Sequence, residues 1–354
     1  MTSGAGGAGR VNPSAAGERG AVRRRERIVL AFTGDLETTA AVAWLAETYG
    51  ADVVTVTADF GRGRDLEEIR DRALAIGALR AHVLDAREEF ARAYLLPALR
   101  AGALADPGGL PAAALGHAAV AAKLVEIAGI EQSNRVAHGG VSAAPRIAAA
   151  IRALTPDFSV LAPATEWGLS RDQLFDYAAK RRLPMPVGGF GTAWPAAPGR
   201  PAPGGGEAAV VDITFAAGVP VALNGVSMPL LDLIGSLDFL AGKNGVGGRR
   251  LFEPPSVAVL AAAHRELQER AGAADVVDFS RAVSARYSGL IVRGDWFTLL
   301  RAALDAYVDR AEQAVNGLVR VKLYEGACEI VHARIGAPQE HDDDAVVGSV
   351  RYRA

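Results

Sequence analysis

Residues 27–39 read RIVLAFTGDLETT, and the rest of the chain is organised around this stretch. Ile28 to Phe32 form a continuous apolar run of strand length, which predicts a strand buried on both faces of a parallel sheet. Thr33 and Gly34 then mark a turn into a helix. Exposed N–H groups and the helix dipole can hold an anion at such a turn, so its geometry is that of a phosphate site.

The same turn carries two carboxylates, those of Asp35 and Glu37. Negative side chains repel phosphate unless a metal ion or a basic partner intervenes. Two interpretations of the loop therefore stay open at this point. It is either an anion-binding loop or a plain strand-to-helix connection, since a turn with a single glycine is a weak signal.

Strand and helix patterns alternate along the first half of the chain, which predicts an α/β fold with a parallel, doubly wound sheet. Ligands of such sheets bind beyond the carboxyl ends of the strands, where residues 33–39 and 58–61 would both lie. The expected strands are 28–32, 52–59, 82–85, 136–140 and 159–163. The expected helices are 36–49, 65–76, 87–100, one that follows a loop at 101–117 and ends near 130, 147–154 and 170–182, the last of them capped by Ser170.

The pattern changes after a segment rich in proline and glycine, residues 184–206, which we interpret as a linker or a collapsed loop. Beyond it we expect a hairpin, four helices and a terminal pair of strands. The hairpin covers 210–215 and 219–223, the helices 230–242, 256–270, 275–287 and 296–316, and the strand pair 318–324 and 327–333.

Composition limits the classes of function. The chain has 354 residues, of which 50% are hydrophobic, so it is long enough for two domains. Its formal net charge of −2 gives no electrostatic footprint for nucleic acid. No apolar run reaches membrane-spanning length, and residues 1–22 lack the apolar core of a signal peptide. The single cysteine, Cys328, fits a reducing compartment. We therefore expect a cytoplasmic protein without nucleic-acid or membrane partners.

Several segments in order closely resemble argininosuccinate synthase. AFTGDLETT corresponds to a family loop that reads Ser-Gly-Gly-Leu-Asp-Thr-Ser, and ADVVTVTADFGRGRDLEEIRDRALAIGA follows it. The resemblance runs from about residue 26 to residue 326. It continues through HVLDAREEFARAYLLPAL, KLVEIA, VAHG, IRALTPDFSVLAPATEWGLSRDQLFDYA, GVPVALNG, AAAHREL and LRAALDAYVDRAEQAVNGLVRVKLYEG.

This resemblance implies a Rossmann-like N-type ATP pyrophosphatase domain of the adenine nucleotide alpha hydrolase class, followed by an α+β synthetase domain. The family joins citrulline to aspartate with ATP and Mg²⁺, releases pyrophosphate and AMP, and forms tetramers. We accordingly expect a small-molecule substrate and a homo-oligomer. The domain limits that follow are a disordered tail at 1–25, a nucleotide-binding domain at 26–165, a synthetase-like domain at 166–335 and a polar C-terminal tail at 336–354.

The resemblance also places the ATP contacts of the family on this chain. The family reaction needs no side-chain nucleophile, so catalysis rests on positioning and charge stabilisation and no catalytic residue is assigned. The sequence suggests no set of protein metal ligands, because Asp59 and Asp65 fit helix caps and turns better than a Mg²⁺ site. The expected ATP contacts are Ala31, Phe32, Thr33, Gly34, Asp35, Leu36, Glu37, Thr38, Thr39, Ala58 and Gly139.

The loops depart from the family pattern where ligands would bind. Asp35 stands where the family has its second glycine, which adds a side chain and a charge where backbone should approach phosphate. On the substrate side, a family Tyr-Pro-Leu-Gly-Thr motif is replaced by GLPAAALGH, and Val141 replaces a threonine. Arg146 and Phe252 are the two substrate contacts that the resemblance retains.

Three interpretations follow from these departures. In the first, the chain has lost the parental reaction, in whole or in part, and acts as a binding or partner protein. In the second, it uses ATP to activate a different and more apolar substrate. In the third, it is a working argininosuccinate synthase whose contacts are rebuilt from other residues. Each lost hydrogen-bond partner of a buried polar substrate costs about 1 to 3 kcal/mol, which favours the first interpretation.

Overall fold

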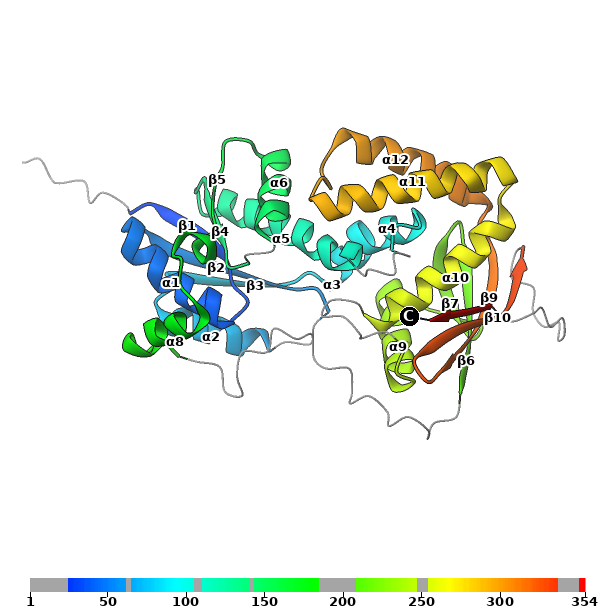
Figure 1. Cartoon of the computed structure of the whole chain (residues 1–354), viewed down its shortest axis with the longest axis horizontal. Coiled ribbons are helices and arrows are strands. Elements are labelled where there is room, and N and C mark those ends of the chain that lie inside the picture. The colour runs from blue at the N-terminus through cyan, green and yellow to red at the C-terminus, as the bar shows by residue number, and fades with distance from the viewer. Residues whose placement is uncertain are drawn as a thin grey trace, which may run out of the picture.

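The computed structural model of this protein describes residues 25–61, 65–104, 110–140, 143–184, 208–246, 254–336 and 350–353. These residues form two sheets with helices packed around them. Figure 1 shows the two sheets at opposite ends of the molecule, with helix α5 (Leu110–Ile130) running between them.

The first sheet is parallel, with the strand order β3-β2-β1-β4-β5. Strand β1 lies at its centre, and it pairs with β2 on one side and with β4 on the other. This arrangement confirms the predicted parallel sheet and all of its strands to within a few residues. The strands are β1 (Arg27–Ala31), β2 (Asp52–Asp59), β3 (Arg80–Asp85), β4 (Arg135–His138) and β5 (Ser159–Leu161).

Helices cover both faces of this sheet, so the residues of β1 are buried on both sides. Ile28 and Leu30 pack into a core with α1 and α2, whereas Val29 packs into a second core with α5 and α6. The doubly wound arrangement predicted from the apolar run is therefore present. The helices of this half are α1 (Leu36–Tyr49), α2 (Leu66–Ile76), α3 (Arg87–Phe90), α4 (Leu96–Arg100), α5, α6 (Ala144–Leu154), α7 (Pro163–Glu166) and α8 (Arg171–Lys180).

Helix α8 begins with the cap that the sequence predicted. The Ser170 side chain accepts a hydrogen bond from the Gln173 backbone, and the Gln173 side chain accepts one from the Ser170 backbone, which is a capping box. Leu174 of α8 packs against Leu36 of α1, so this helix rests on the first domain. The division of the chain at residues 165 and 166 stays a prediction.

The second sheet is antiparallel and has the strand order β11-β10-β9-β6-β7-β8. Its hairpin and its long C-terminal strand pair confirm the pattern read from the sequence. The strands are β6 (Ala209–Ala216), β7 (Val219–Leu223), β8 (Val226–Ser227), β9 (Gly317–Tyr324), β10 (Ala327–Ile335) and β11 (Val350–Arg353). The helices are α9 (Leu230–Lys243), α10 (Pro255–Ala271), α11 (Ala274–Arg293), α12 (Leu299–Ala311) and a 3₁₀ turn at Glu312–Ala314.

The structure differs from the sequence prediction in several places, among them the end of α11, which continues to Arg293 and not only to residue 287. The expected loop at 101–117 was wrong over part of its length, because α5 begins at Leu110; the proline at position 111 is tolerated in a first helical turn. A π-helical turn at Ala91–Leu95 joins α3 to α4, within the single helix expected there. The expected polar C-terminal tail contains β11, which pairs with Ala327–Ile330 of β10.

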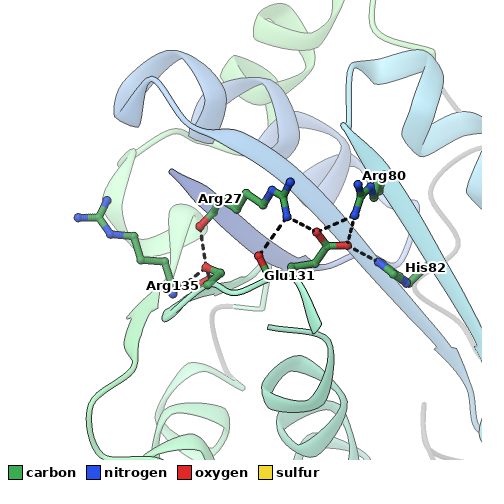
Figure 2. A network of polar contacts seen from close by, with 6 residues as sticks. Arg27, Arg80, His82, Glu131 and Arg135 are labelled. Atoms are coloured by element: carbon green, nitrogen blue, oxygen red, sulfur yellow. Dashed lines mark hydrogen bonds and ion pairs between the residues drawn. The ribbon is translucent and has the colours of Figure 1, made fainter. Parts of the chain in front are cut away.

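A buried carboxylate joins three basic side chains at the edge of the first sheet where β1 and β3 begin. Glu131 follows α5, and its side chain is fully buried. Figure 2 shows its two carboxylate oxygens accepting hydrogen bonds from Arg27 at 2.8 Å, from Arg80 at 3.1 Å and from His82 at 2.9 Å. This network holds β1, β3 and the end of α5 together, at the end of the sheet opposite the carboxyl ends of its strands.

Candidate functional site

The carboxyl ends of β1, β2 and β4 meet at one edge of the first sheet, because these strands are parallel neighbours. The loop between β1 and α1 lies at this edge, together with Ala58 near the end of β2 and Gly139 directly after β4. The structure therefore brings together all the positions expected to contact ATP. That they bind ATP stays a prediction.

Gly139 contacts the first turn of α1 so closely that no side chain fits there. A Cβ atom at this position would lie 2.6 Å from Thr38 Cγ2 and 3.5 Å from the Thr38 backbone nitrogen. The turn after β4 and the start of α1 thus form one compact wall of the site. The HG pair in VAHGG was the sequence signal for this turn.

Gly34 adopts a left-handed conformation, with φ of 73°. The Arg72 guanidinium of α2 lies against it and donates a hydrogen bond from Nη1 to the Gly34 carbonyl at 3.0 Å. Arg72 also forms an ion pair with Glu68. The shape of the loop is therefore fixed by a side chain from the next helix, which sequence reasoning did not identify.

Asp35 is the N-cap of α1, and its carboxylate is satisfied by the loop itself. Asp35 Oδ1 accepts hydrogen bonds from the Thr38 backbone nitrogen at 2.8 Å and from Thr38 Oγ1 at 2.6 Å. Asp35 Oδ2 accepts a hydrogen bond from Thr33 Oγ1 at 2.6 Å. The Asp35 charge would destabilise the loop if it were unpaired. It is paired, and it lies where the helix dipole favours an anion.

Glu37, the second carboxylate of the loop, pairs with the neighbouring helix α8. Its Oε1 atom accepts a hydrogen bond from Arg171 Nη1 at 3.2 Å. Arg171 is thus a basic partner of this loop, and the sequence alone did not identify it. The positive charge of Arg171 on α8 therefore balances the negative charge of Glu37 at the loop.

Several buried polar atoms at this edge have no hydrogen-bond partner among the described residues. They are Thr39 Oγ1 in the first turns of α1, Glu37 Oε2 and, apart from a contact with the Gly140 backbone, both ring nitrogens of His138 at the end of β4. Thr39 is fully buried and His138 is 2% exposed. Burial lowers the pKa of His138, so its imidazole is neutral at pH 7. Buried polar groups are nearly always paired in folded proteins, which indicates that a ligand or ordered water completes this edge.

In the sequence, the position of His138 directly before Gly139 in the HG pair is the only signal for a ligand role. A histidine in a strand and a threonine in a helix can equally be ordinary core residues. The hydrogen bonding of His138 and Thr39 could therefore be seen only in three dimensions.

Arg146 is committed to a contact between helices in this structure. Its Nε atom donates a hydrogen bond to the Val292 carbonyl of α11 at 2.7 Å. Gly294, with φ of 84°, packs against the Arg146 backbone, where a Cβ atom would lie 2.4 Å from the Arg146 carbonyl oxygen. Phe252, the other expected substrate contact, lies outside the described residues. A substrate role for both stays a prediction.

Comparisons with known proteins agree with this arrangement. Residues 27–184 match the family model described as the arginosuccinate synthase N-terminal HUP domain, and residues 199–346 match the arginosuccinate synthase C-terminal domain. The chain belongs to the argininosuccinate synthase family. This membership confirms the predicted fold, a HUP domain with a parallel sheet followed by a synthetase domain.

Individual relatives are similar over most of both chains. Argininosuccinate synthase of Symbiobacterium thermophilum is 36% identical over an alignment 346 residues long that covers 86% of each chain. That of Streptococcus thermophilus is 35% identical over an alignment 362 residues long that covers 90% of each chain. Among solved structures, the U34-tRNA thiolase NcsA from Methanococcus maripaludis covers 71% of this chain and 75% of its own at 11% identity, but its TM-score of 0.32 is too low to support any conclusion.

Within the described ranges, no group of three or more His, Cys, Asp or Glu side chains could hold a metal ion. None of the helices in those ranges is long and apolar enough to span a membrane.

Proposed function

We propose that this chain is an adenine-nucleotide-binding member of the argininosuccinate synthase family in which the parental ligation of citrulline and aspartate is impaired or lost. One observation carries the proposal. The family's expected ATP positions converge on an edge where Thr39 and His138 are buried with polar atoms that lack partners. Such an edge is suited to a ligand with several hydrogen-bonding groups.

The loss of the parental reaction is supported by the residues on the substrate side. Ala114, which stands in the segment where the family has a tyrosine and a hydroxyl residue, is 4% exposed and packs into the core of the second domain. Arg146 is engaged by Val292. Each absent partner of a polar substrate costs about 1 to 3 kcal/mol, and 1.4 kcal/mol is a tenfold loss of affinity.

Mg²⁺ would enter this site with the nucleotide. Both carboxylate oxygens of Asp35 already accept hydrogen bonds from Thr33 and Thr38, so they are not open metal ligands. We therefore assign Mg²⁺ to the phosphates of a bound nucleotide, where it supplies neutralising charge.

A second candidate function is an ATP-dependent ligase for a different substrate. It is favoured by two observations, that the family's expected ATP positions lie together at one edge and that alanine replaces hydroxyl residues on the substrate side. Pyrophosphate release from ATP that needs an added acid or ureido compound other than citrulline would support this alternative.

Calorimetric titration with adenosine and with ATP, with Mg²⁺ present throughout, tests the nucleotide site. We expect measurable binding of at least one of them. Gly139→Ala should weaken it by about tenfold or more, because overpacking against Thr38 costs about 1 to 3 kcal/mol and displaces the turn.

Gly129→Ala is the matched control, because a Cβ atom at this position in α5 meets nothing within 4 Å. It should leave binding unchanged, and thermal unfolding of both variants shows that each is folded. The absence of binding by either ligand, or equal binding by the wild type and a folded Gly139→Ala variant, would contradict the proposed site.

A further inference from the structure

The N-terminus of α1 already holds an anion, which the chain itself supplies. The carboxylate of Asp35 caps this helix of 14 residues and accepts three hydrogen bonds, one from the Thr38 backbone nitrogen and two from the hydroxyls of Thr33 and Thr38. The same backbone N–H groups and the same dipole would otherwise attract a phosphate group of a ligand. Two anions cannot occupy this position together.

The repulsion between Asp35 and a phosphate group is large enough to affect binding. Two unit charges 4 Å apart interact by about 1 kcal/mol in bulk water and by about 4 kcal/mol at the effective dielectric constant near a protein surface. Arg72 lies beside the loop, but its guanidinium is engaged by the Gly34 carbonyl and by Glu68, and Arg171 pairs with Glu37. Among the residues that the structure describes, the positive charges nearest the loop are therefore already balanced.

Two neutral polar groups are left for a ligand at this edge, beside Glu37 Oε2 of the carboxylate that pairs with Arg171. They are the hydroxyl of Thr39 and the imidazole of His138, both almost completely buried and, apart from a contact of His138 with the Gly140 backbone, without partners among the described residues. Gly139, next to His138, contacts the turn of α1 that Asp35 caps. Hydroxyl and neutral imidazole groups suit the hydroxyls and ring nitrogens of a nucleoside better than they suit a phosphate chain.

We propose that this site takes an adenine nucleoside with no phosphate group at the N-terminus of α1, and that the Asp35 carboxylate is a built-in substitute for that phosphate. This inference rests on the proposed nucleotide site and adds its ligand class. Affinity should then fall, or stay level, from adenosine through AMP to ATP. In a phosphate-binding loop it would rise with each phosphate.

The test compares the affinity of the full-length protein for adenosine and for ATP by calorimetry, with Mg²⁺ in every titration. Asp35→Ser removes the charge and keeps a good helix cap, and Asp35→Gly restores the glycine of the family. Removing one like charge near a phosphate should raise the affinity for ATP relative to adenosine by about tenfold or more in both variants.

Asp65→Ser is the matched control. Asp65 caps α2 in the same way, accepting hydrogen bonds from the backbone nitrogens of Glu67 and Glu68, and both of these bonds lie within α2 and not in the α1 loop. The ratio of the two affinities should not change in this variant. A change equal to that of Asp35→Ser would mean that the effect does not depend on a charge at the N-terminus of α1, and would overturn the inference.

The outcomes separate this inference from the proposed function. Wild-type protein that binds ATP at least about tenfold more tightly than adenosine, with no change in Asp35→Ser, overturns the inference and leaves the nucleotide site standing. Protein that binds neither adenosine nor ATP in any variant overturns both.

Discussion

Two acidic side chains, Asp35 and Glu131, lie at opposite edges of the first sheet and are stabilised by different means. Asp35 is half-buried and is held by hydroxyls, a backbone nitrogen and a helix dipole. Glu131 is fully buried and is held by charged partners on two strands. The first shapes the ligand edge, and the second fixes the edge that no ligand is expected to reach.

The structure predicts how Glu131 makes stability depend on pH. Burial raises its pKa, but hydrogen bonds from His82 and Arg80 and the charges of Arg80 and Arg27 lower it more, to below the ordinary value of 4.5. A carboxyl group whose pKa is lower in the folded than in the unfolded chain stabilises the fold above pH 4.5, and this contribution is lost as the pH falls through the folded pKa.

We therefore expect Glu131→Gln to lower the free energy of unfolding by about 3 kcal/mol at pH 7, since it breaks a buried charge network. Below pH 4.5 the difference from the wild type should shrink. Asp71→Asn, in an exposed ion pair with Arg70, is the control and should cost no more than about 1 kcal/mol. Denaturant unfolding at several pH values measures both, and a pH-independent difference would contradict the assignment.

Among the elements, α5 is the one that both halves of the molecule share. Its first half, including Leu115 and Ala118, packs into the core of the antiparallel sheet with α10 and α11. Its second half, including Leu124 and Ile127, packs against β1, β2 and β4 of the parallel sheet. One rigid helix thus enters two hydrophobic cores, as Figure 1 shows for its course between the sheets.

This shared helix predicts a single cooperative unfolding transition. Leu115→Ala and Leu124→Ala, each in a different core, should each cost about 2 to 5 kcal/mol and should each shift the same transition. Ile130→Ala is the control, because Ile130 is 62% exposed at the end of the same helix. Calorimetry that resolves two transitions, with each leucine variant moving only one of them, would contradict the coupling.

Across the whole molecule, the sequence predicted the helices and strands that depend on local periodicity. It did not predict those that form only through contacts with other elements. The strands of the parallel sheet, the Ser170 cap and the hairpin followed from apolar runs and cap residues. The start of α5 did not, because its alanine-rich first turns are buried by other elements and show no amphipathic period. Strand β11 exists through its pairing with β10, which no short segment reveals alone.

The candidate site divides in the same way. The resemblance gave the positions that meet at the sheet edge, and the structure brought them together. The resemblance could not identify the hydrogen-bond partners of Asp35. These partners, the Thr33 hydroxyl and the first turn of α1, are known only once the loop and the helix are placed in space. It also gave no indication that Arg171 would balance Glu37, since these residues are 134 positions apart.

The measurement that tests the central claim most directly is pyrophosphate release from MgATP, with and without citrulline and aspartate. An argininosuccinate synthase relative such as that of Symbiobacterium thermophilum, assayed in parallel, is the positive control. We predict that release dependent on both substrates is at least about thirtyfold slower than in the relative, because two or more substrate partners worth about 1 to 3 kcal/mol each are absent. Release at a rate similar to that of the relative, requiring both citrulline and aspartate, would contradict the account.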